Sequence, residues 1–184
     1  MSTSSSFWLG LCLANACAFP ATARSANNAP LYDSSFDANR PASLGYNTPE
    51  DDARPGEKFF YRGAFAFRHK QYKFAVDMYK VAASWAYKPA EYNLGVMYLH
   101  GQGIAVDLPR AMAWFALAAE RGNKDYVAAR ELLYAHLSKE QFAQANVVWR
   151  ELKPTFGDEV ALSRAKARWA DVRNNVTGSH VGSI

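Results

Sequence analysis

Residues 90–122 read AEYNLGVMYLHGQGIAVDLPRAMAWFALAAERG, and this stretch determines how the rest of the chain can fold. In its first half Ala90, Leu94 and Tyr98 recur at four-residue steps, which is the spacing of one face of a helix. The apolar residues of that face need a partner surface. The first half therefore predicts a short helix that packs against its neighbours.

A tight turn and a second helix follow in the same stretch. Gly101 and Gly103 end the first helix, because glycine adopts a positive φ at little cost. Asp107 can accept backbone N–H groups at the start of the second helix, and Pro109 suits a first helical turn. The apolar stripe and the end of the second helix comprise Ala111, Trp114, Ala118, Ala119 and Gly122. A hairpin this small cannot bury both of its faces alone.

A degenerate copy of the hairpin precedes it. Gly63 aligns with Gly95 at an offset of 32 residues, and Ala75 aligns with Ala111 at an offset of 36. The difference of four residues is a shorter turn in the first copy. A repeat of about 36 residues with a variable turn predicts a helical solenoid.

A third helix pair and a last helix follow the central hairpin. The third pair runs from residue 123 to 153, with a capping box that begins at Ser138 and with Pro154 as the expected end. Arg130 and Glu131 stand where the central hairpin has Leu94 and Gly95, so we interpret this pair as a terminal cap. The last helix begins at residue 158, and its apolar face comprises Leu162, Ala165, Trp169 and Val172.

The central stretch resembles the Sel1-like repeats, which are relatives of the tetratricopeptide repeats. Thirteen positions of that family's pattern occur in it without a gap: Ala90, Leu94, Gly95, Tyr98, Gly101, Gly103, Ile104, Asp107, Ala111, Trp114, Ala118, Ala119 and Gly122. The resemblance implies an α-solenoid that binds other proteins, and it does not name the partner. We expect an all-α fold, a short right-handed α-solenoid of two to three helix-turn-helix repeats with a C-terminal capping helix and a disordered N-terminal leader.

The chain divides into four parts by composition: a signal peptide over 1–23, a flexible leader over 24–57, the repeat domain over 58–153, and an amphipathic helix with a loose tail over 154–184. An apolar core over 7–19 precedes Pro20 and Ala21-Thr22-Ala23, which is the pattern of a secretory signal cleaved after Ala23. Residues 1–6 contain no Lys or Arg, which departs from that pattern. We expect a periplasmic or secreted protein, and a cytoplasmic chain with an uncleaved N-terminus is the alternative.

Cysteine content and hydropathy restrict the chemistry of the mature chain. Cys12 and Cys17 both lie inside the proposed signal, so the mature chain contains no disulfide and no catalytic thiol. No apolar run reaches the roughly 18 to 20 residues of a membrane helix, and no transmembrane span is expected.

The charge is distributed unevenly along the chain. Residues 1–57 carry a net charge of −3, whereas residues 58–184 carry +7. A basic surface can bind phosphates, but an exported protein does not meet the genome, so we expect no nucleic-acid partner. An anionic envelope surface is a possible partner of the basic part.

The sequence contains no pattern that indicates catalysis, a metal site or a cofactor. His69, His100, His136 and His180 are scattered and lack the spacing of metal ligands. No serine, base and acid are placed as a nucleophilic triad. Lone acids such as Glu91 are expected to be solvated. We therefore predict no catalytic, metal-binding or cofactor-binding residues.

A binding groove is expected on the inner face of the first helix of each repeat. The residues assigned to it share positions that face away from the paired helix: Phe60, Phe67, Arg68, Tyr92, Val96, Leu99 and His136. Such an apolar, solvent-facing strip usually marks a binding site. The alternative is that the chain fills its own groove with the Leu162–Trp169–Val172 face of the last helix.

The resemblance and the expected groove predict an exported, non-catalytic adaptor that binds a peptide or helix of another protein. Two alternatives stay open at this point. One is an envelope-associated enzyme or a small-molecule or lipid binder that uses an acid the sequence does not identify. The other is a cytoplasmic repeat scaffold.

Overall fold

The computed structural model describes residues 52–177, with side chains up to residue 175. The elements are α2 (Pro55–Arg68), α3 (Tyr72–Ser84), α4 (Lys88–His100), α5 (Leu108–Ala118), the 3-10 helix η1 (Ala119–Arg121), α6 (Lys124–Tyr134), α7 (Lys139–Phe156) and α8 (Asp158–Thr177). The described part of the chain contains no strand, which confirms the all-α fold class. The proposed signal peptide, most of the leader and the end of the tail lie outside these residues.

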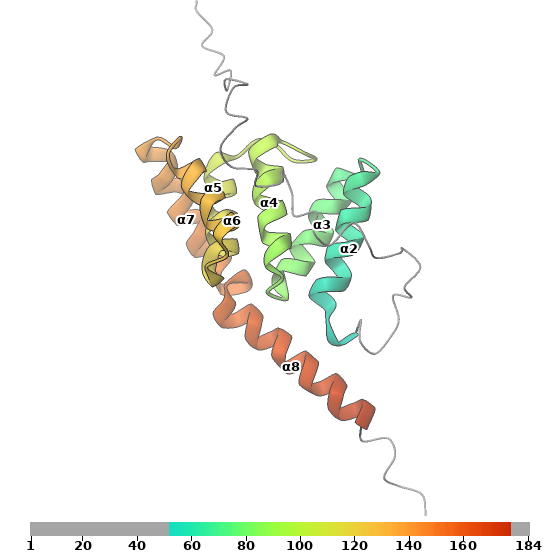
Figure 1. Ribbon diagram of the computed structural model, residues 1–184. Helices are drawn as coiled ribbons and strands as arrows, with labels where there is room; N and C mark the ends of the chain where they lie inside the picture. Colours follow the sequence, from blue (N-terminus) through green and yellow to red (C-terminus); the bar gives the residue numbers. More distant parts are fainter. Residues whose placement is uncertain (1–51, 178–184) are drawn as a thin grey trace, which may run out of the picture.

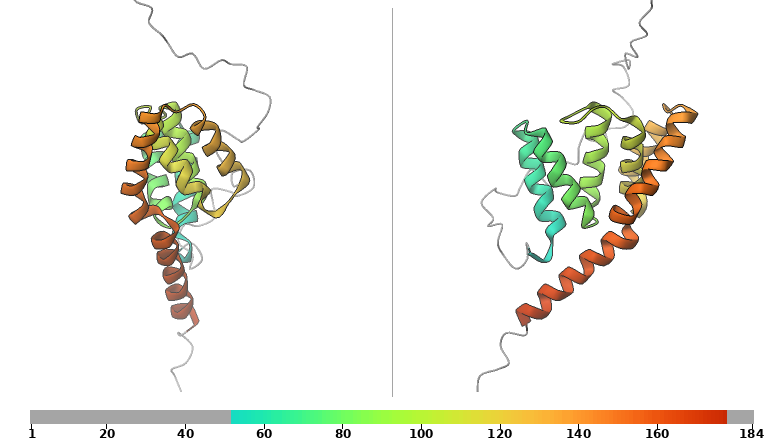
Figure 2. Two further views of the ribbon diagram at one scale, coloured as in Figure 1. Left: turned by 90° about the vertical axis from the view of Figure 1, so that its left-hand side faces the viewer. Right: turned by 180° about the vertical axis from the view of Figure 1, so that it is seen from behind.

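The hairpins α2–α3 and α4–α5 stand side by side in one row, and α6 follows α5 in the same row (Figure 1). The helix α7 packs mainly along α5, although α6 precedes it in the sequence. The helix α8 leaves the row and crosses beneath it towards the start of α2, which both further views also show (Figure 2). None of the described helices is long and apolar enough to cross a lipid bilayer.

Each of the first two hairpins depends on a glycine that faces an aromatic ring. A Cβ atom at Gly63 would lie 2.7 Å from the ring of Tyr79, and a Cβ atom at Gly95 would lie 2.6 Å from the ring of Phe115. The rings are 36 residues apart, which is the offset expected from the sequence. The same contact therefore sets the helix spacing in both hairpins.

The turn between α4 and α5 joins the two hairpins. Gly103 has a φ of +76°, and a Cβ atom there would lie 2.5 Å from Cβ of Tyr72 at the start of α3. Only glycine lets the turn lie so close to the neighbouring hairpin. Asp107 then caps α5 by accepting a hydrogen bond of 2.8 Å from the backbone N–H of Arg110.

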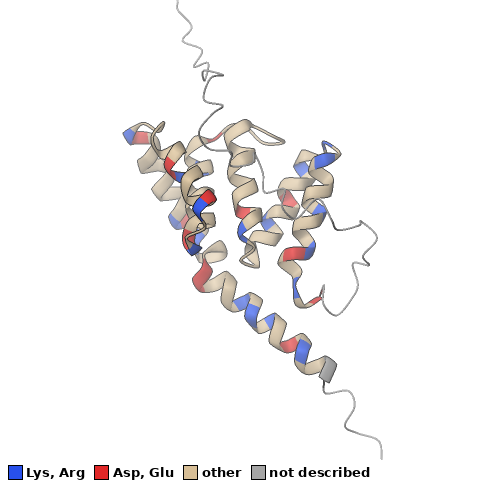
Figure 3. Ribbon diagram, viewed as in Figure 1, with Lys and Arg blue, Asp and Glu red and all other residues tan. Residues whose placement is uncertain are grey.

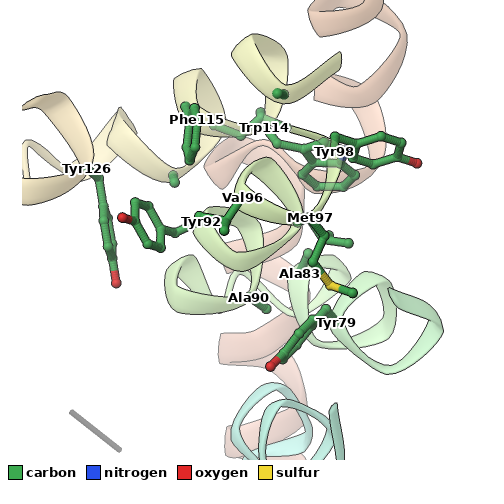
Figure 4. Packing of buried hydrophobic residues seen from close by; sticks show 14 of the residues in the cluster. Tyr79, Ala83, Ala90, Tyr92, Val96, Met97, Tyr98, Trp114, Phe115 and Tyr126 are labelled. Carbon is green, nitrogen blue, oxygen red and sulfur yellow. The ribbon is translucent and has the colours of Figure 1, made fainter. Parts of the chain in front are cut away.

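The core lies between the hairpins and consists of alanines packed around a few large side chains. Tyr92 of α4 lies between Phe115 of α5 and Tyr126 of α6, with ring centroids 5.5 Å and 4.9 Å away (Figure 4). Trp114 is 1% exposed and packs edge-on against Phe156 at 4.8 Å, which joins α5 to the end of α7. The alanines on the helix–helix contacts are fully enclosed: Ala75, Ala82, Ala83, Ala90, Ala111 and Ala118.

Two predicted boundaries fall inside helices. The helix α2 begins at Pro55, so the last residues assigned to the leader are helical, because proline fits the first turn of a helix. The helix α7 continues through Pro154 to Phe156, because a proline removes one hydrogen bond to the preceding turn but does not prevent the next residues from being helical. Gly157, with extended φ and ψ of −62° and 148°, ends α7 instead.

We expect Gly95→Ala to lower the free energy of unfolding by about 1–3 kcal/mol, because the added methyl group overpacks the contact with Phe115. Replacing Phe115 by Leu in the same chain should restore part of the loss. Urea denaturation followed by circular dichroism measures both effects.

Gly122→Ala is the matched control. Gly122 has a φ of +71°, but a Cβ atom added there would meet no other atom within 4 Å, so only backbone strain opposes the substitution. Phe115→Leu should not restore the stability of this control. Restoration of both variants alike would show that the ring does not set the helix spacing.

Candidate functional site

Three residues of the predicted groove are buried inside the row of helices. Phe60 is 1% exposed, Tyr92 4% and Val96 5%, so the prediction that they line an open groove is wrong. Neighbouring hairpins cover these residues: Tyr126 of α6 stacks on Tyr92, and Tyr87 packs against Phe60. In so short a solenoid the inner positions form the core.

The other four groove residues do not form one surface either. Phe67 and Leu99 are partly buried and pack against the core. Arg68 and His136 are exposed, but Arg68 ends α2 and His136 follows α6, at opposite ends of the row (Figure 1). The last helix does not fill a groove, because it crosses beneath the row and leaves Trp169 45% exposed.

A cleft of about 360 Å³ opens instead between α6 and α7, with α5 as its floor. Three aromatic side chains and a methionine form most of its wall, and three polar side chains lie among them. The lining residues are Met112, Ala113, Ala116, Arg130, Glu131, Tyr134, Phe142, Ala145, Asn146 and Trp149. We call this the α6–α7 cleft.

The cleft exists because the third helix pair lacks the glycine–ring contact. Glu131 stands where α4 has Gly95, so the following helix cannot lie close against α6. The two helices meet near their turn, where Tyr134 and Phe142 pack edge-on with ring centroids 4.9 Å apart. Beyond this contact α7 packs along α5. The departure at Arg130 and Glu131 is the sequence signal for this site, although by itself it indicates only a terminal cap.

A second polar site lies inside the protein, at the start of α4. Lys88 is 5% exposed and Glu91 is fully buried, which contradicts the expectation that Glu91 is solvated. The Lys88 ammonium donates to Glu91 at 3.0 Å and to Glu120 at 2.8 Å, and lies 3.0 Å from a carboxylate oxygen of Asp158. Three carboxyl groups therefore surround one ammonium group.

A guanidinium group completes this cluster. Arg121 donates two hydrogen bonds of 2.7 and 2.8 Å to the carboxylate of Asp158 and one of 2.9 Å to the carbonyl of Ala86. The backbone N–H of Asp158 donates to Glu120 at 3.0 Å. We call these five residues the ionic cluster: Lys88, Glu91, Glu120, Arg121 and Asp158. It joins α4, η1 and the first residue of α8.

Burial raises the pKa of Glu91 to about 8, because no water reaches its carboxylate. With Glu91 protonated, Lys88 and Arg121 balance Glu120 and Asp158, and the cluster is neutral. The Glu91 side chain is fully buried, and its carboxylate accepts hydrogen bonds from the Lys88 ammonium. The ionic cluster therefore ties α4 and η1 to the first turn of α8.

Within residues 52–177, no group of three or more His, Cys, Asp or Glu side chains is placed to hold a metal ion. The histidines at 69 and 136 each lie within 2.8 Å of a carbonyl oxygen in the preceding helical turn, those of Phe65 and Leu132. His180 lies outside the described residues.

The stacked helical hairpins, their glycine–ring contacts and the open last pair define an all-α helical-repeat protein. Residues 88–123 match the Sel1 repeat family, so this part of the chain is a Sel1-like repeat. The match covers the central hairpin, which contains the thirteen positions of the family pattern.

A solved structure has the same kind of fold. It is the crystal structure of c5321, a protective antigen present in uropathogenic Escherichia coli strains that displays an SLR fold. The TM-score is 0.51 at 21% sequence identity, and the alignment covers 70% of this chain and 26% of that chain. At this identity the likeness shows the fold alone. A comparison with curated protein sequences gave no match.

We expect the free energy of unfolding to fall as the pH rises from about 5 to about 8. In this window folded Glu91 keeps a proton that the unfolded chain, with a pKa of 4.5, has lost. Raising the pH therefore favours the unfolded state. Glu91→Gln, which stays neutral at every pH, should remove this dependence in urea denaturation measured across the range.

The exposed Glu159→Gln is the control and should keep the pH dependence of the wild type. A wild-type stability that is flat over this range, or one that rises, would show that Glu91 is ionised when folded.

Proposed function

We propose that this protein is a non-catalytic adaptor that binds a segment of a partner protein in the α6–α7 cleft. Sel1-like repeat folds generally mediate protein–protein interaction, and they are typically scaffolds without catalytic activity. The proposal adds the place of binding and the chemistry of the bound segment.

The observation that carries this proposal is the cleft itself. Its volume of about 360 Å³ lies within the range of ligand pockets, and such pockets combine apolar walls with a few polar groups. Phe142 and Trp149 of α7 and Met112 of α5 all line it. A cavity of this size accommodates one or two large apolar side chains of a partner.

The surface beside the cleft extends the apolar area. Leu132 is 58% exposed and Tyr134 50% exposed, both on α6. Arg130 and Glu131 form an ion pair at the edge, and Asn146 adds an amide. This arrangement suits an amphipathic helix or an extended segment whose apolar side chains enter the cleft while its backbone meets the polar edge.

Filling the cleft should abolish partner binding without unfolding the protein. We expect Ala116→Phe, which places a ring in the cleft from its floor, to prevent crosslinking from a photoreactive residue at Asn146 in source cells. Because Ala116 is only partly buried, the variant should retain wild-type helicity by circular dichroism.

Ala143→Phe is the matched control, since Ala143 is exposed on α7 and does not line the cleft. A photoreactive residue at Lys124, which is also exposed and outside the cleft, should give no adduct. An Asn146 adduct that persists in Ala116→Phe would show that the partner binds elsewhere.

The proposal includes export. Its support is the apolar core over residues 7–19 and the small residues Ala21 and Ala23 after Pro20, all outside the described residues. Mass spectrometry of protein from source cells should find Arg24 at the N-terminus. An intact N-terminus in the cytoplasmic fraction would support a cytoplasmic scaffold instead and would leave the cleft test unaffected.

A further inference from the structure

A second hollow, of about 300 Å³, lies between α8 and the start of α2. Its wall is mainly apolar and aromatic, and it shares no residue with the α6–α7 cleft. The residues that matter here are Pro55, Trp85, Tyr87, Ala165, Lys166 and Trp169. We call it the α8 hollow.

The helix α8 spans this hollow with little apolar packing of its own. Arg164 donates to the carbonyl of Ser84, and Arg168 donates to the carbonyl of Asp52 at 3.1 Å. Ala161 is buried near the ionic cluster, but Trp169 lines the hollow and is still 45% exposed. Polar contacts therefore hold the outer part of α8 beside a hollow with apolar walls.

The chain enters the described structure at this point. Asp52 lies next to α8 through its contact with Arg168, and it also pairs with Lys58 at 3.6 Å. Directly before it the sequence reads LGYNTPED over residues 44–51. Six residues span at most about 20 Å, so Tyr46, six residues before Asp52, is within reach of the hollow.

The charges on the two sides are complementary. Glu50 and Asp51 follow the apolar pair Leu44 and Tyr46 in the sequence, and they precede Asp52. Lys166 of α8 lines the hollow, and Arg168 lies beside it and also pairs with Asp171 at 3.3 Å. On the side of α2, Arg54 lines the hollow together with Glu57, with which it pairs at 3.8 Å. Figure 3 shows this basic stretch of α8 next to the start of α2.

We infer that residues 44–51 of the same chain occupy the α8 hollow. Tyr46 enters between Trp85 and Trp169, and the acidic pair Glu50 and Asp51 lies along the basic side of α8. The segment then binds α8 to the first hairpin at the end opposite the ionic cluster. This inference is independent of the proposed partner binding, because the two cavities have no residue in common.

Hydrogen exchange of the full chain tests the inference. Leu44→Ser with Tyr46→Ser should make the amides of residues 162–173 exchange roughly tenfold faster, which is the effect of losing one buried aromatic side chain and its neighbour. Tyr32→Ser, in the more distant part of the leader, is the matched control and should leave the exchange unchanged. Neither variant alters a residue of the helical body.

Crosslinking gives a second, direct test. Tyr46→Cys with Ala165→Cys should form a disulfide in a chain whose Cys12 and Cys17 are replaced by Ser, because a disulfide requires Cα atoms within about 7 Å. Tyr32→Cys with Ala165→Cys is the control pair and should form little.

Equal exchange in wild type and in the double serine variant would overturn the inference. A disulfide that joins two chains, or one whose yield rises with protein concentration, would also overturn it, since the occupant would then be a second copy. A disulfide within one chain at every concentration, together with faster exchange in α8, supports it.

Discussion

The contact between a helical glycine and an aromatic ring determines the spacing on which the rest of this structure depends. At Gly95 the ring of Phe115 lies where a side chain would otherwise begin, so α4 and α5 pack closely along their length. Gly63 and Tyr79 repeat the contact in the first hairpin. Where the chain has Glu131 instead, α7 moves onto α5 and a cleft opens. The last pair thus offers a cavity because it fails to repeat the motif.

The ionic cluster has a different role from the glycine contacts. It places two cations and three acids at the junction of α4, η1 and α8, where an apolar core would not select a single direction for α8. Removing a buried cation such as Lys88 is strongly destabilising, at about 3–5 kcal/mol in typical cases, because the carboxyl groups around it lose their partner. Asp158 accepts from Arg121 in a bidentate arrangement, which also fixes the orientation of the first turn of α8.

The helices and the central repeat could be predicted because local signals specify them. Gly101, Asp107 and the capping box at Ser138 mark helix ends through their own backbone and side-chain chemistry. Burial could not be predicted in the same way. The spacing of Tyr92 and Val96 identifies a helix face, but whether that face meets solvent or another hairpin depends on how many hairpins are present. The burial of Glu91 could not be predicted for a related reason. Glu120 and Asp158, the other two acids around Lys88, are distant from it in the sequence.

The ionic cluster also makes the two hairpins unequal. At the positions that align with Lys88 and Glu91, the first hairpin has Gly56 and Phe59. Only the second hairpin carries the charges that pair with Asp158 at the start of α8. Exchanging the order of the two hairpins would preserve both glycine–ring contacts. It would also bury Lys88 and Glu91 at a place where Asp158 could not pair with Lys88. The order of the hairpins is therefore fixed. A duplicated hairpin could be added before α2, but one inserted between η1 and α8 would move Asp158 away from Lys88.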